Sequence, residues 1–424
     1  MKKVLLIIMS FLFLTLGVKA EEDFAPNAKS AILVDNLSGK VLYEKNADEK
    51  LAPASMTKLG SMLLIMEAID NGSLKLEDKV TISEEAANMG GSQVFLQAGE
   101  SYTVHDLLKG IAIASGNDAV VAMAEKIGGS QSAFVEMLNK RLKEIGAVNT
   151  NFVNAHGLDA EGHYSTARDM SIIARELLKH PKILEYTSIY EEYLEKNDGS
   201  RIWLVNTNRL VRFYEGVDGL KTGFTKTAGY CLTATAKKDN FRLVSVVMGE
   251  DTTENRSSDT VKMLNYAFNT FKINIIKTKG EVLGKVRVER GKQDVANIVL
   301  SEAATELLKI TDPATNYKFN LLVDKIKAPV KKGDVVGLAQ IIDDAGNIVD
   351  EVDVTVEKDV KKGKSDRSRF RSRCQNNSES SDYKCNPSIT RCTRSLCKLC
   401  SRCSAWKRRS YYSYPWYGNI FQCR

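Results

Sequence analysis

Ser55 and Lys58 stand three residues apart in the stretch Ser55-Met56-Thr57-Lys58, at the start of a long apolar segment. That spacing puts both side chains on one face of a helix, so the lysine amine can reach the serine hydroxyl. A serine hydroxyl becomes a nucleophile only when a neighbouring base takes its proton, and lysine can be that base only if its pKa is lowered. The pattern predicts nucleophilic catalysis, although most such tetrapeptides are ordinary solvated helix starts.

Two further motifs carry groups that could bind or protonate a substrate. Ser115-Gly116-Asn117 falls in a break between two helical segments, where a hydroxyl and an amide could relay a proton and hold a carbonyl. Lys221-Thr222-Gly223 begins a strand, where a cation and a hydroxyl could bind a carboxylate. Gly223 would let a substrate backbone approach the edge of that strand. Each motif also has a structural explanation, a pair of helix caps for the first and a plain strand start for the second.

The elements that would position these motifs are helices in the middle of the segment and strands at both of its ends. Alternation of apolar and polar residues predicts two hairpins, Ala31–Asp35 with Lys40–Glu44 and Gly229–Lys237 with Phe241–Met248. Helical periodicity and capping residues predict helices over Ala54–Ile69, Val104–Ala114, Asp118–Ile127, Gln131–Ile145 and Glu254–Phe271. This pattern predicts an α+β fold with an antiparallel sheet.

The chain divides into four segments of different composition. Residues 1–20 match a secretory signal peptide, with Lys2 and Lys3 before an apolar run that is shorter than the ~20 residues of a spanning helix. Residues 21–271 hold all three motifs and are the predicted catalytic domain. Residues 272–358 show short alternating strands and are predicted to form a separate small β-rich domain. Residues 359–424 are a tail rich in Cys, Arg and Ser, to which we assign no fold.

Charge and cysteine are concentrated in this tail. The whole chain has a net charge of +7, but from Gly363 to Arg424 14 Lys and Arg residues stand against 3 Asp and Glu residues. The preceding part therefore has a net charge of about −4. Seven of the eight cysteines also lie in the tail. We therefore expect the globular part to be neither a disulfide-stapled scaffold nor a nucleic-acid-binding protein.

Histidine and cysteine in the globular part do not form a metal-binding pattern. The chain has four histidines, and none is paired at the spacing of metal ligands. We expect His156 and His163 to pack and to order loops. Cys231 lies on a predicted buried strand, which favours a place in the core. No metal or organic cofactor is implied.

The three motifs, in this order and spacing, resemble the active-site signature of penicilloyl-serine transferases. More closely, the chain resembles the low-molecular-mass penicillin-binding proteins that are serine-type D-alanyl-D-alanine carboxypeptidases. The likeness covers residues 1 to about 358 and includes the flanking stretches Ala52–Lys58, Asn154–Leu158, His163–Ala167 and Gly216–Gly223. It implies a β-lactamase/transpeptidase-like catalytic domain, with an antiparallel sheet and helices, followed by a small all-β domain.

The resemblance also implies a role for each residue of the motifs. Ser55 would attack the carbonyl between two terminal D-alanines of a peptidoglycan stem peptide, with Lys58 as general base and Ser115 relaying the proton to the leaving amine. The other residues would bind the substrate: Asn117 its amide, Lys221, Thr222 and Arg256 its free carboxylate, and the backbone N–H groups of Ser55 and Phe224 the oxyanion, with Gly223 allowing close approach. Oxyanion-hole donors typically contribute ~3–4 kcal/mol of transition-state stabilisation.

Two other functions share part of this pattern. A serine β-lactamase uses the same chemistry, but class A enzymes have Ser-Asp-Asn where this chain has Ser115-Gly116-Asn117, and they usually lack an appended β-domain. A catalytically silent wall-binding or β-lactam-sensing protein would not need the complete set of motifs. We therefore favour the carboxypeptidase, with the stem peptide and β-lactam antibiotics as partners and the extracytoplasmic side of the cell envelope as its location.

The tail stands where members of the family commonly end in an amphipathic helix on the membrane, so peripheral membrane association stays open. Cysteine spacing typical of a metal or iron–sulfur cluster is one interpretation, which an exported protein disfavours. A basic aromatic segment for anionic lipid or wall polymer is another. We prefer a third, translation out of frame after the lysine-rich stretch Lys361–Lys364. The residues concerned are Cys392, Cys397, Cys400 and Cys403 for the cluster and Trp406, Tyr411, Tyr412 and Trp416 for the surface-binding segment.

Overall fold

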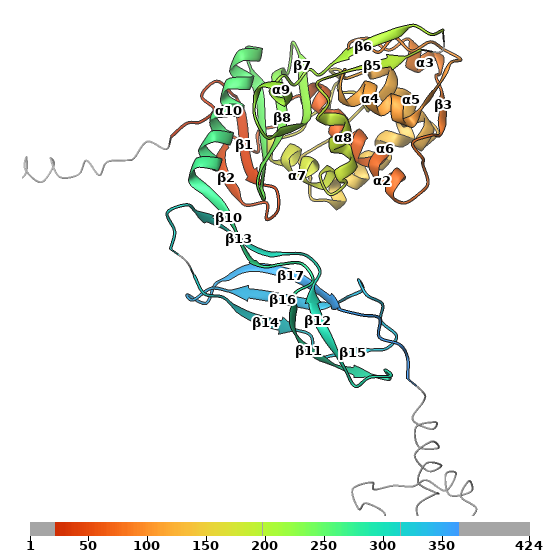
Figure 1. Cartoon of the computed structure of the whole chain (residues 1–424). Coiled ribbons are helices and arrows are strands. Elements are labelled where there is room, and N and C mark those ends of the chain that lie inside the picture. Colours follow the sequence, from red (N-terminus) through yellow and green to blue (C-terminus); the bar gives the residue numbers. More distant parts are fainter. Residues whose placement is uncertain (1–21, 197, 314, 364–424) are drawn as a thin grey trace, which may run out of the picture. The chain divides into compact units, whose positions relative to one another are not determined.

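The computed structural model describes residues 22–196, 198–313 and 315–363, and the chain forms two compact units (Figure 1). The first unit contains the residues up to Lys277 with Thr305–Tyr317 and Asp343–Asp350. The second contains Thr278–Ala304, Lys318–Ile342 and the residues from Glu351 onward. The predicted signal peptide and residues 364–424 of the tail lie outside the described residues.

A five-stranded antiparallel sheet runs through the first unit and carries one of the three motifs on its edge. The strand order is β2-β1-β9-β8-β7, so β7 pairs on one side only. The predicted hairpins β1–β2 and β8–β9 are confirmed. The strands are β1 Ser30–Asp35, β2 Val41–Lys45, β7 Val217–Thr225, β8 Gly229–Lys238 and β9 Phe241–Glu250.

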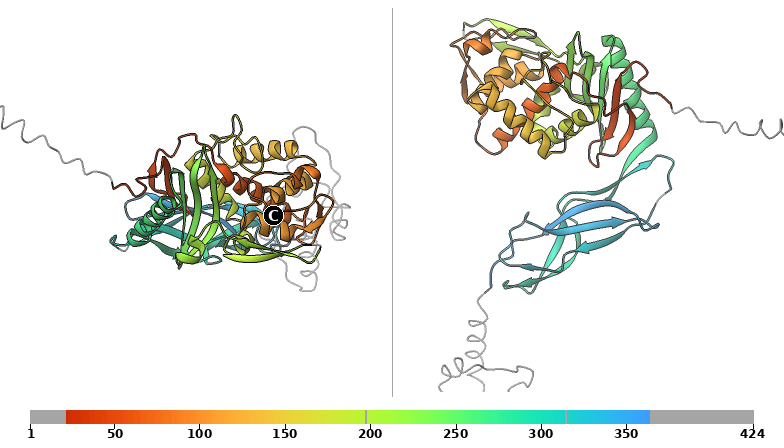
Figure 2. Two further views of the ribbon diagram at one scale, coloured as in Figure 1. Left: turned by 90° about the horizontal axis from the view of Figure 1, so that it is seen from above. Right: turned by 180° about the vertical axis from the view of Figure 1, so that it is seen from behind.

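Both faces of this sheet are covered, because alternate residues of its strands pack into two different cores. On β9, Val244 and Val246 pack with the group of helices that includes α2, whereas Leu243 and Val247 pack against α10. Figure 2 shows α10 on one side of the sheet and the group of helices that includes α2 on the opposite side. The predicted α+β layer with an antiparallel sheet is therefore confirmed.

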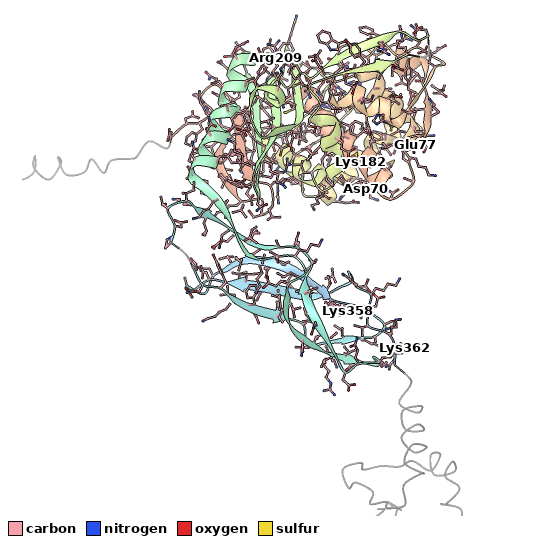
Figure 3. All side chains as sticks on the ribbon, viewed as in Figure 1. Asp70, Glu77, Lys182, Arg209, Lys358 and Lys362 are labelled. Carbon is pink, nitrogen blue, oxygen red and sulfur yellow. The ribbon has the colours of Figure 1, made fainter. Side chains whose placement is uncertain are left out.

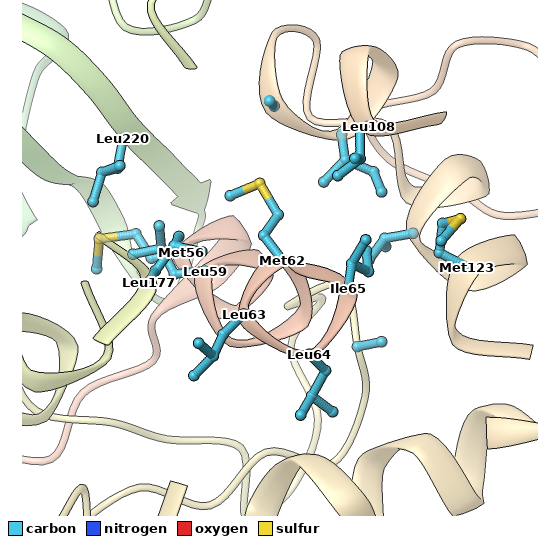
Figure 4. Close-up of a cluster of buried hydrophobic side chains, with 14 of the residues drawn as sticks. Met56, Leu59, Met62, Leu63, Leu64, Ile65, Leu108, Met123, Leu177 and Leu220 are labelled. Carbon is cyan, nitrogen blue, oxygen red and sulfur yellow. The ribbon is translucent and has the colours of Figure 1, made fainter. Parts of the chain in front are cut away.

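Helix α2 is the central element of the larger core, since Met62, Leu63 and Ile65 are completely buried on different sides of it (Figure 4). A helix that is apolar all round is buried on all sides. Capping side chains begin several of the surrounding helices, for example Thr103, whose hydroxyl accepts the N–H of Asp106. The helices are η1 Ala54–Thr57, α2 Lys58–Asp70, α3 Glu84–Ala87, α4 Val104–Ala112, α5 Asn117–Gly128, α6 Gln131–Glu144, α7 Ala167–Leu177, η2 Pro181–Ile183, α8 Leu184–Thr187, α9 Leu210–Phe213 and α10 Thr253–Thr270.

The helix predicted from Ala54 begins differently from expectation. Residues 54–57 form a 3₁₀ turn, and the α-helix starts at Lys58. The reason is local: Ala54 has a left-handed backbone with φ +47°, which an α-helix does not accommodate. The nucleophile candidate Ser55 therefore lies in a tight turn that immediately precedes the α-helix in the sequence.

Three small two-stranded sheets complete the first unit, and the second unit is a six-stranded β structure. The small sheets pair β3 Lys79–Thr81 with β4 Ser101–Thr103, β5 Glu191–Glu195 with β6 Arg201–Val205, and β10 Phe271–Lys277 with β13 Ala304–Lys309. The six-stranded sheet has the order β14-β16-β17-β12-β11-β15. Its strands are β11 Val282–Glu289, β12 Val295–Leu300, β14 Lys318–Leu322, β15 Lys325–Lys327, β16 Val335–Ile342 and β17 Ile348–Val356.

The second unit also includes residues beyond the predicted boundary at 358. Val360 is buried and forms a β-bridge with Val330, and the N–H of Gly363 donates to Arg290 O. Charged side chains lie on the outside of each unit, for example Asp70 in the first and Lys358 in the second (Figure 3). Within the described residues no helix is long and apolar enough to cross a membrane.

Candidate active site

Lys58 and Ser55 are in direct contact where the 3₁₀ turn passes into α2. Lys58 Nζ lies 3.0 Å from Ser55 Oγ, 2.6 Å from Asn117 Oδ1 and 2.7 Å from the carbonyl oxygen of His156. The lysine is completely buried. Burial, together with the positive charge of Lys221, holds its pKa well below the ordinary value.

These three contacts orient the amine when it is neutral. Asn117 Oδ1 and His156 O can only accept, so the two protons of a neutral amine point at them. The lone pair of Lys58 is then left facing Ser55 Oγ, which can donate its proton to it. The arrangement is that of a general base positioned against a nucleophile.

The second motif lies in the turn between α4 and α5. Ser115 has φ +65°, is buried, and its Oγ has no hydrogen-bond partner among the described residues. Asn117 is more constrained than the sequence indicates. Besides its contact with Lys58, its Nδ2 donates to Gly90 O at 2.6 Å and its backbone N–H donates to Ser92 O at 2.7 Å. Asn117 therefore ties residues 90–92 to the site, and one of its two amide N–H groups makes no hydrogen bond to a described residue.

Asp118 binds residues 94–96, which follow the segment held by Asn117. It was not identified from the sequence as a residue of the site. Its carboxylate accepts the N–H of Val94 at 3.0 Å and the N–H of Leu96 at 3.1 Å, and it is buried. Phe95, between these two residues, is left 65% exposed with φ +54°. An acidic residue in the first turn of α5 was the only signal, and it also fits an ordinary helix start.

The third motif places two buried cations close together. Lys221 lies on β7, and burial together with the charge of Arg256 lowers its pKa to about 7. Arg256, in the first turn of α10, is also buried, and its Nε has no hydrogen-bond partner among the described residues. Neither residue forms a salt bridge with a described residue. Two unpaired buried cations favour the binding of an anion.

The remaining residues of this motif contact the protein itself. Thr222 Oγ1 lies 2.6 Å from Thr207 Oγ1. Gly223 is needed for close packing, because a Cβ there would lie 2.7 Å from Pro53 O and 3.2 Å from Met56 N, in the turn that carries Ser55. The ring of Phe224 stacks on that of Tyr230, with centroids 4.3 Å apart, and remains half-exposed.

His156 and His163 are both buried. Burial lowers the pKa of His156 and of His163 to about 4 in each case. His156 contributes its carbonyl oxygen to Lys58, and its Nδ1 accepts the N–H of Leu158. Cys231 is completely buried, as predicted. No group of His, Cys, Asp and Glu that could hold a metal occurs among the described residues.

The structure thus brings Ser55, Lys58 and Asn117 into hydrogen-bond contact, and the charge of Lys221 acts on Lys58. Ser115 Oγ makes no hydrogen bond to Ser55 or Lys58 in this structure. The contact of His156 O with Lys58 joins residues 98 positions apart in the chain, and no local pattern signals it.

Two family models match the chain. The model described as D-alanyl-D-alanine carboxypeptidase matches residues 17–252, and the model of the C-terminal domain of penicillin-binding protein 5 matches residues 271–362. The D-alanyl-D-alanine carboxypeptidase DacF of Bacillus subtilis is 49% identical over 345 residues, which cover 81% of this chain and 88% of that protein. DacC of Escherichia coli, with the same description, is 38% identical over 77% of this chain and 84% of its own length.

Solved structures show the same fold. The chain is similar to penicillin-binding protein 5 from Haemophilus influenzae, with a TM-score of 0.65 and 32% identity, covering 82% of this chain and all of that one. It is also similar to penicillin-binding protein D2 from Listeria monocytogenes in its ampicillin-bound form, with a TM-score of 0.52 and 32% identity over 57% of this chain and 98% of that one. The resemblance and fold predicted from the sequence are confirmed: the chain belongs to the D-alanyl-D-alanine carboxypeptidase family.

Proposed function

We propose that the chain removes the terminal D-alanine from peptidoglycan stem peptides through an acyl-enzyme on Ser55. The observation that carries this proposal is the buried amine of Lys58, whose two carbonyl partners leave its lone pair facing Ser55 Oγ at 3.0 Å. A serine becomes nucleophilic at neutral pH only with such a base beside it. The lowered pKa of Lys58 supplies the base in its neutral form.

The reaction proceeds in two halves. Ser55 Oγ attacks the carbonyl carbon of the penultimate D-alanine while its proton passes to Lys58. The C–N bond then breaks, and the proton returns through Ser115 to the nitrogen of the leaving D-alanine. Water attacks the resulting ester with Lys58 again as base, which releases the shortened peptide and restores Ser55. The free hydroxyl of buried Ser115 is available for this relay.

Substrate binding uses the groups around this pair. Lys221 and Arg256 meet the terminal carboxylate, because both are buried cations without a salt bridge among the described residues. Thr222 adds its hydroxyl, and Asn117 offers its remaining amide N–H to the peptide. The N–H groups of Ser55 and Phe224 hold the oxyanion, and their approach depends on Gly223, which packs against the turn before Ser55.

The same site accounts for β-lactams as covalent inhibitors. The D2 protein from Listeria monocytogenes has been solved with bound ampicillin. A β-lactam presents a strained amide and a carboxylate, which match the nucleophile and the two cations of this site. We place the activity on the extracytoplasmic side of the cell envelope, where stem peptides occur. Peripheral association with the membrane depends on the tail, which lies outside the described residues.

Labelled penicillin followed over time tests this function. We expect a long-lived adduct on Ser55, identified by peptide mass spectrometry, and release of D-alanine from a peptide ending in D-Ala-D-Ala. Ser55→Ala should abolish both and leave folding intact, because the hydroxyl is small and lies at a turn. Rapid turnover of penicillin would instead indicate a β-lactamase. Absence of an adduct in the folded wild type would indicate a binding protein.

A further inference from the structure

A chain of three hydrogen bonds runs from Val153 through His163 and Thr57 to Ala54, the residue before Ser55. The backbone N–H of Val153 donates to His163 Nδ1 at 3.0 Å, and His163 Nε2 lies 2.8 Å from Thr57 Oγ1. The hydroxyl of Thr57 in turn donates to Ala54 O at 2.8 Å. His163 has no part in the chemistry proposed above.

The direction of each bond is fixed by the groups at the two ends. A carbonyl oxygen only accepts, so the hydroxyl proton of Thr57 points at Ala54 O, and Thr57 Oγ1 must accept from His163. A backbone N–H only donates, so Nδ1 of His163 carries no proton. The first constraint requires a proton on Nε2 and the second excludes one on Nδ1, so together they require the neutral Nε2–H tautomer.

The surroundings of the ring hold it in this state. His163 is buried and stacks on Phe152, with centroids 5.2 Å apart and planes at 18°. Burial lowers its pKa to about 4, while the charge of Asp159 acts in the opposite direction. A second proton on Nδ1 would face the N–H of Val153, donor against donor. The ring is therefore a fixed donor toward Thr57 at neutral pH.

At the other end of these hydrogen bonds, the backbone of Ala54 is strained. Ala54 has φ +47°, a conformation that a residue with a Cβ keeps only when its surroundings impose it. Its carbonyl oxygen lies against Gly157, where a Cβ would come within 1.9 Å of it. A Cβ at Gly223 would lie 3.1 Å from Ala54 Cβ. The direction in which the chain leaves Ala54 determines where Ser55 points.

We propose that His163 is a positioning residue for the nucleophile: as an Nε2–H donor it holds the Thr57 hydroxyl on the Ala54 carbonyl and fixes the backbone that presents Ser55 to Lys58. This inference rests on the proposed role of Ser55. Without the donor, the Thr57 hydroxyl is free to turn away and Ala54 loses a hydrogen bond that holds it. Misplacing a reacting group by ~1 Å can slow a reaction by about 100-fold.

The test measures the rate constant of acylation by labelled penicillin in the full chain. His163→Leu fills the space without a donor, and we expect acylation slowed by about 10- to 100-fold. His163→Gln, which can present an N–H to Thr57, should restore most of the rate. Thr57→Val should be slow as well, and His163→Leu should add little in the Thr57→Val background, because both changes break the same chain. His105→Leu, which removes another 2.8 Å contact of a histidine with a hydroxyl, that of Tyr186, is the control and should acylate normally.

Nitrogen-15 NMR of the wild-type protein tests the inference without any variant. We expect the Nε2–H tautomer for His163 across neutral pH, and an Nδ1–H tautomer would overturn the proposal even if His163→Leu did not fold. Additive losses in the double variant, or normal acylation of His163→Leu, would also overturn it. A wild-type protein that is not acylated at all would instead contradict the proposed function, so the two failures are distinct.

Discussion

Lys221 and Lys58 are two buried amines, and the positive charge of Lys221 opposes protonation of Lys58, the amine that contacts Ser55. Burial lowers the pKa of both, and the charge of Lys221 lowers that of Lys58 further. Asp118 acts in the opposite direction on Lys58 and Arg256 in the same direction on Lys221. Because Lys58 faces a hydroxyl and two carbonyl oxygens, it is suited to be the neutral base. Lys221 is the amine whose charge a substrate carboxylate would stabilise.

This division predicts a bell-shaped pH profile of kcat/KM. Activity should rise with pH as Lys58 loses its proton, and fall as pH rises through about 7, where Lys221 becomes neutral in the free enzyme. Lys221→Arg should move the descending limb to higher pH, since a guanidinium stays charged. The pH of the descending limb is the quantity to compare. The maximum of kcat/KM is not, because the arginine also changes the geometry of the site and lowers that maximum. Identical descending limbs in both proteins would show that Lys221 does not set it.

Gly157 should be essential because a side chain at this position would collide with Ala54. Gly146 is the control that separates this collision from backbone strain. Gly157 has φ +92° and Gly146 has φ +93°, but a Cβ meets Ala54 O at 1.9 Å in the first case and nothing within 4 Å in the second. Gly146→Ala should cost about 1–2 kcal/mol of stability and leave acylation unchanged. Gly157→Ala should cost more and also slow acylation, since it displaces Ala54 and the adjacent carbonyl of His156. Thermal unfolding and penicillin labelling measure the two effects. Equal behaviour of the two variants would contradict this packing argument.

The sequence predicted those parts of the site that depend on local pattern. Ser55 and Lys58 meet because their spacing fits one helical turn, and the hairpin that follows Lys221 was visible in its alternation. The contacts of Lys58 with Asn117 and His156 join segments 59 and 98 residues away, which no local pattern encodes. For the same reason the sequence does not reveal that Asn117 hydrogen-bonds to Lys58, Gly90 and Ser92.

Secondary structure between residues 151 and 215 was left unpredicted for two different reasons. Helix α7 has signals that could have been used, since Thr166 caps it and Met170, Ile173 and Leu177 recur at helical spacing. Strand β5 has the sequence Glu-Glu-Tyr-Leu-Glu, in which charged residues predominate and only Leu194 is fully buried. It is a strand because β6 pairs with it, and such a tertiary cause is not readable from composition.

Asp118 should both shape the loop at residues 94–96 and influence the base. Asp118→Asn keeps the size of the side chain but replaces one acceptor by a donor. Oδ1 accepts the N–H of Ala119 and Oδ2 accepts those of Val94 and Leu96, so at least one of these backbone N–H groups loses its partner. We expect faster hydrogen exchange at these amides. Removing the negative charge should also lower the pKa of Lys58 and move the ascending limb of kcat/KM to lower pH.

Asp169→Asn is the matched control for this variant. Asp169 is an equally buried carboxylate that accepts the N–H of Asn149 at 2.7 Å. The control should lose stability without moving the ascending limb. A shift of the limb in both variants, or in neither, would show that Asp118 has no specific effect on Lys58.

Recognition of the free carboxylate gives the sharpest test of the substrate class. If Lys221 and Arg256 bind the terminal carboxylate, a peptide amidated at its last D-alanine should be cleaved much more slowly than the free acid. A buried charged hydrogen bond left without its partner typically costs ~2–5 kcal/mol, or a factor of ~30 to several thousand. The loss should appear in kcat/KM, which measures transition-state stabilisation relative to free enzyme and substrate.

The ratio of acid to amide cleavage then separates the contributions of the two cations. Lys221→Ala should lower this ratio, because the variant has less interaction to lose when the carboxylate is removed. The decrease should be partial, since Arg256 is buried near Lys221 and lowers its pKa by repulsion. Arg256→Ala should also lower the ratio, and the double variant should bring it close to one. Because the ratio compares two substrates on the same protein, a general loss of activity or stability cancels. A ratio that stays the same in the wild type, both single variants and the double variant would show that neither residue binds the carboxylate.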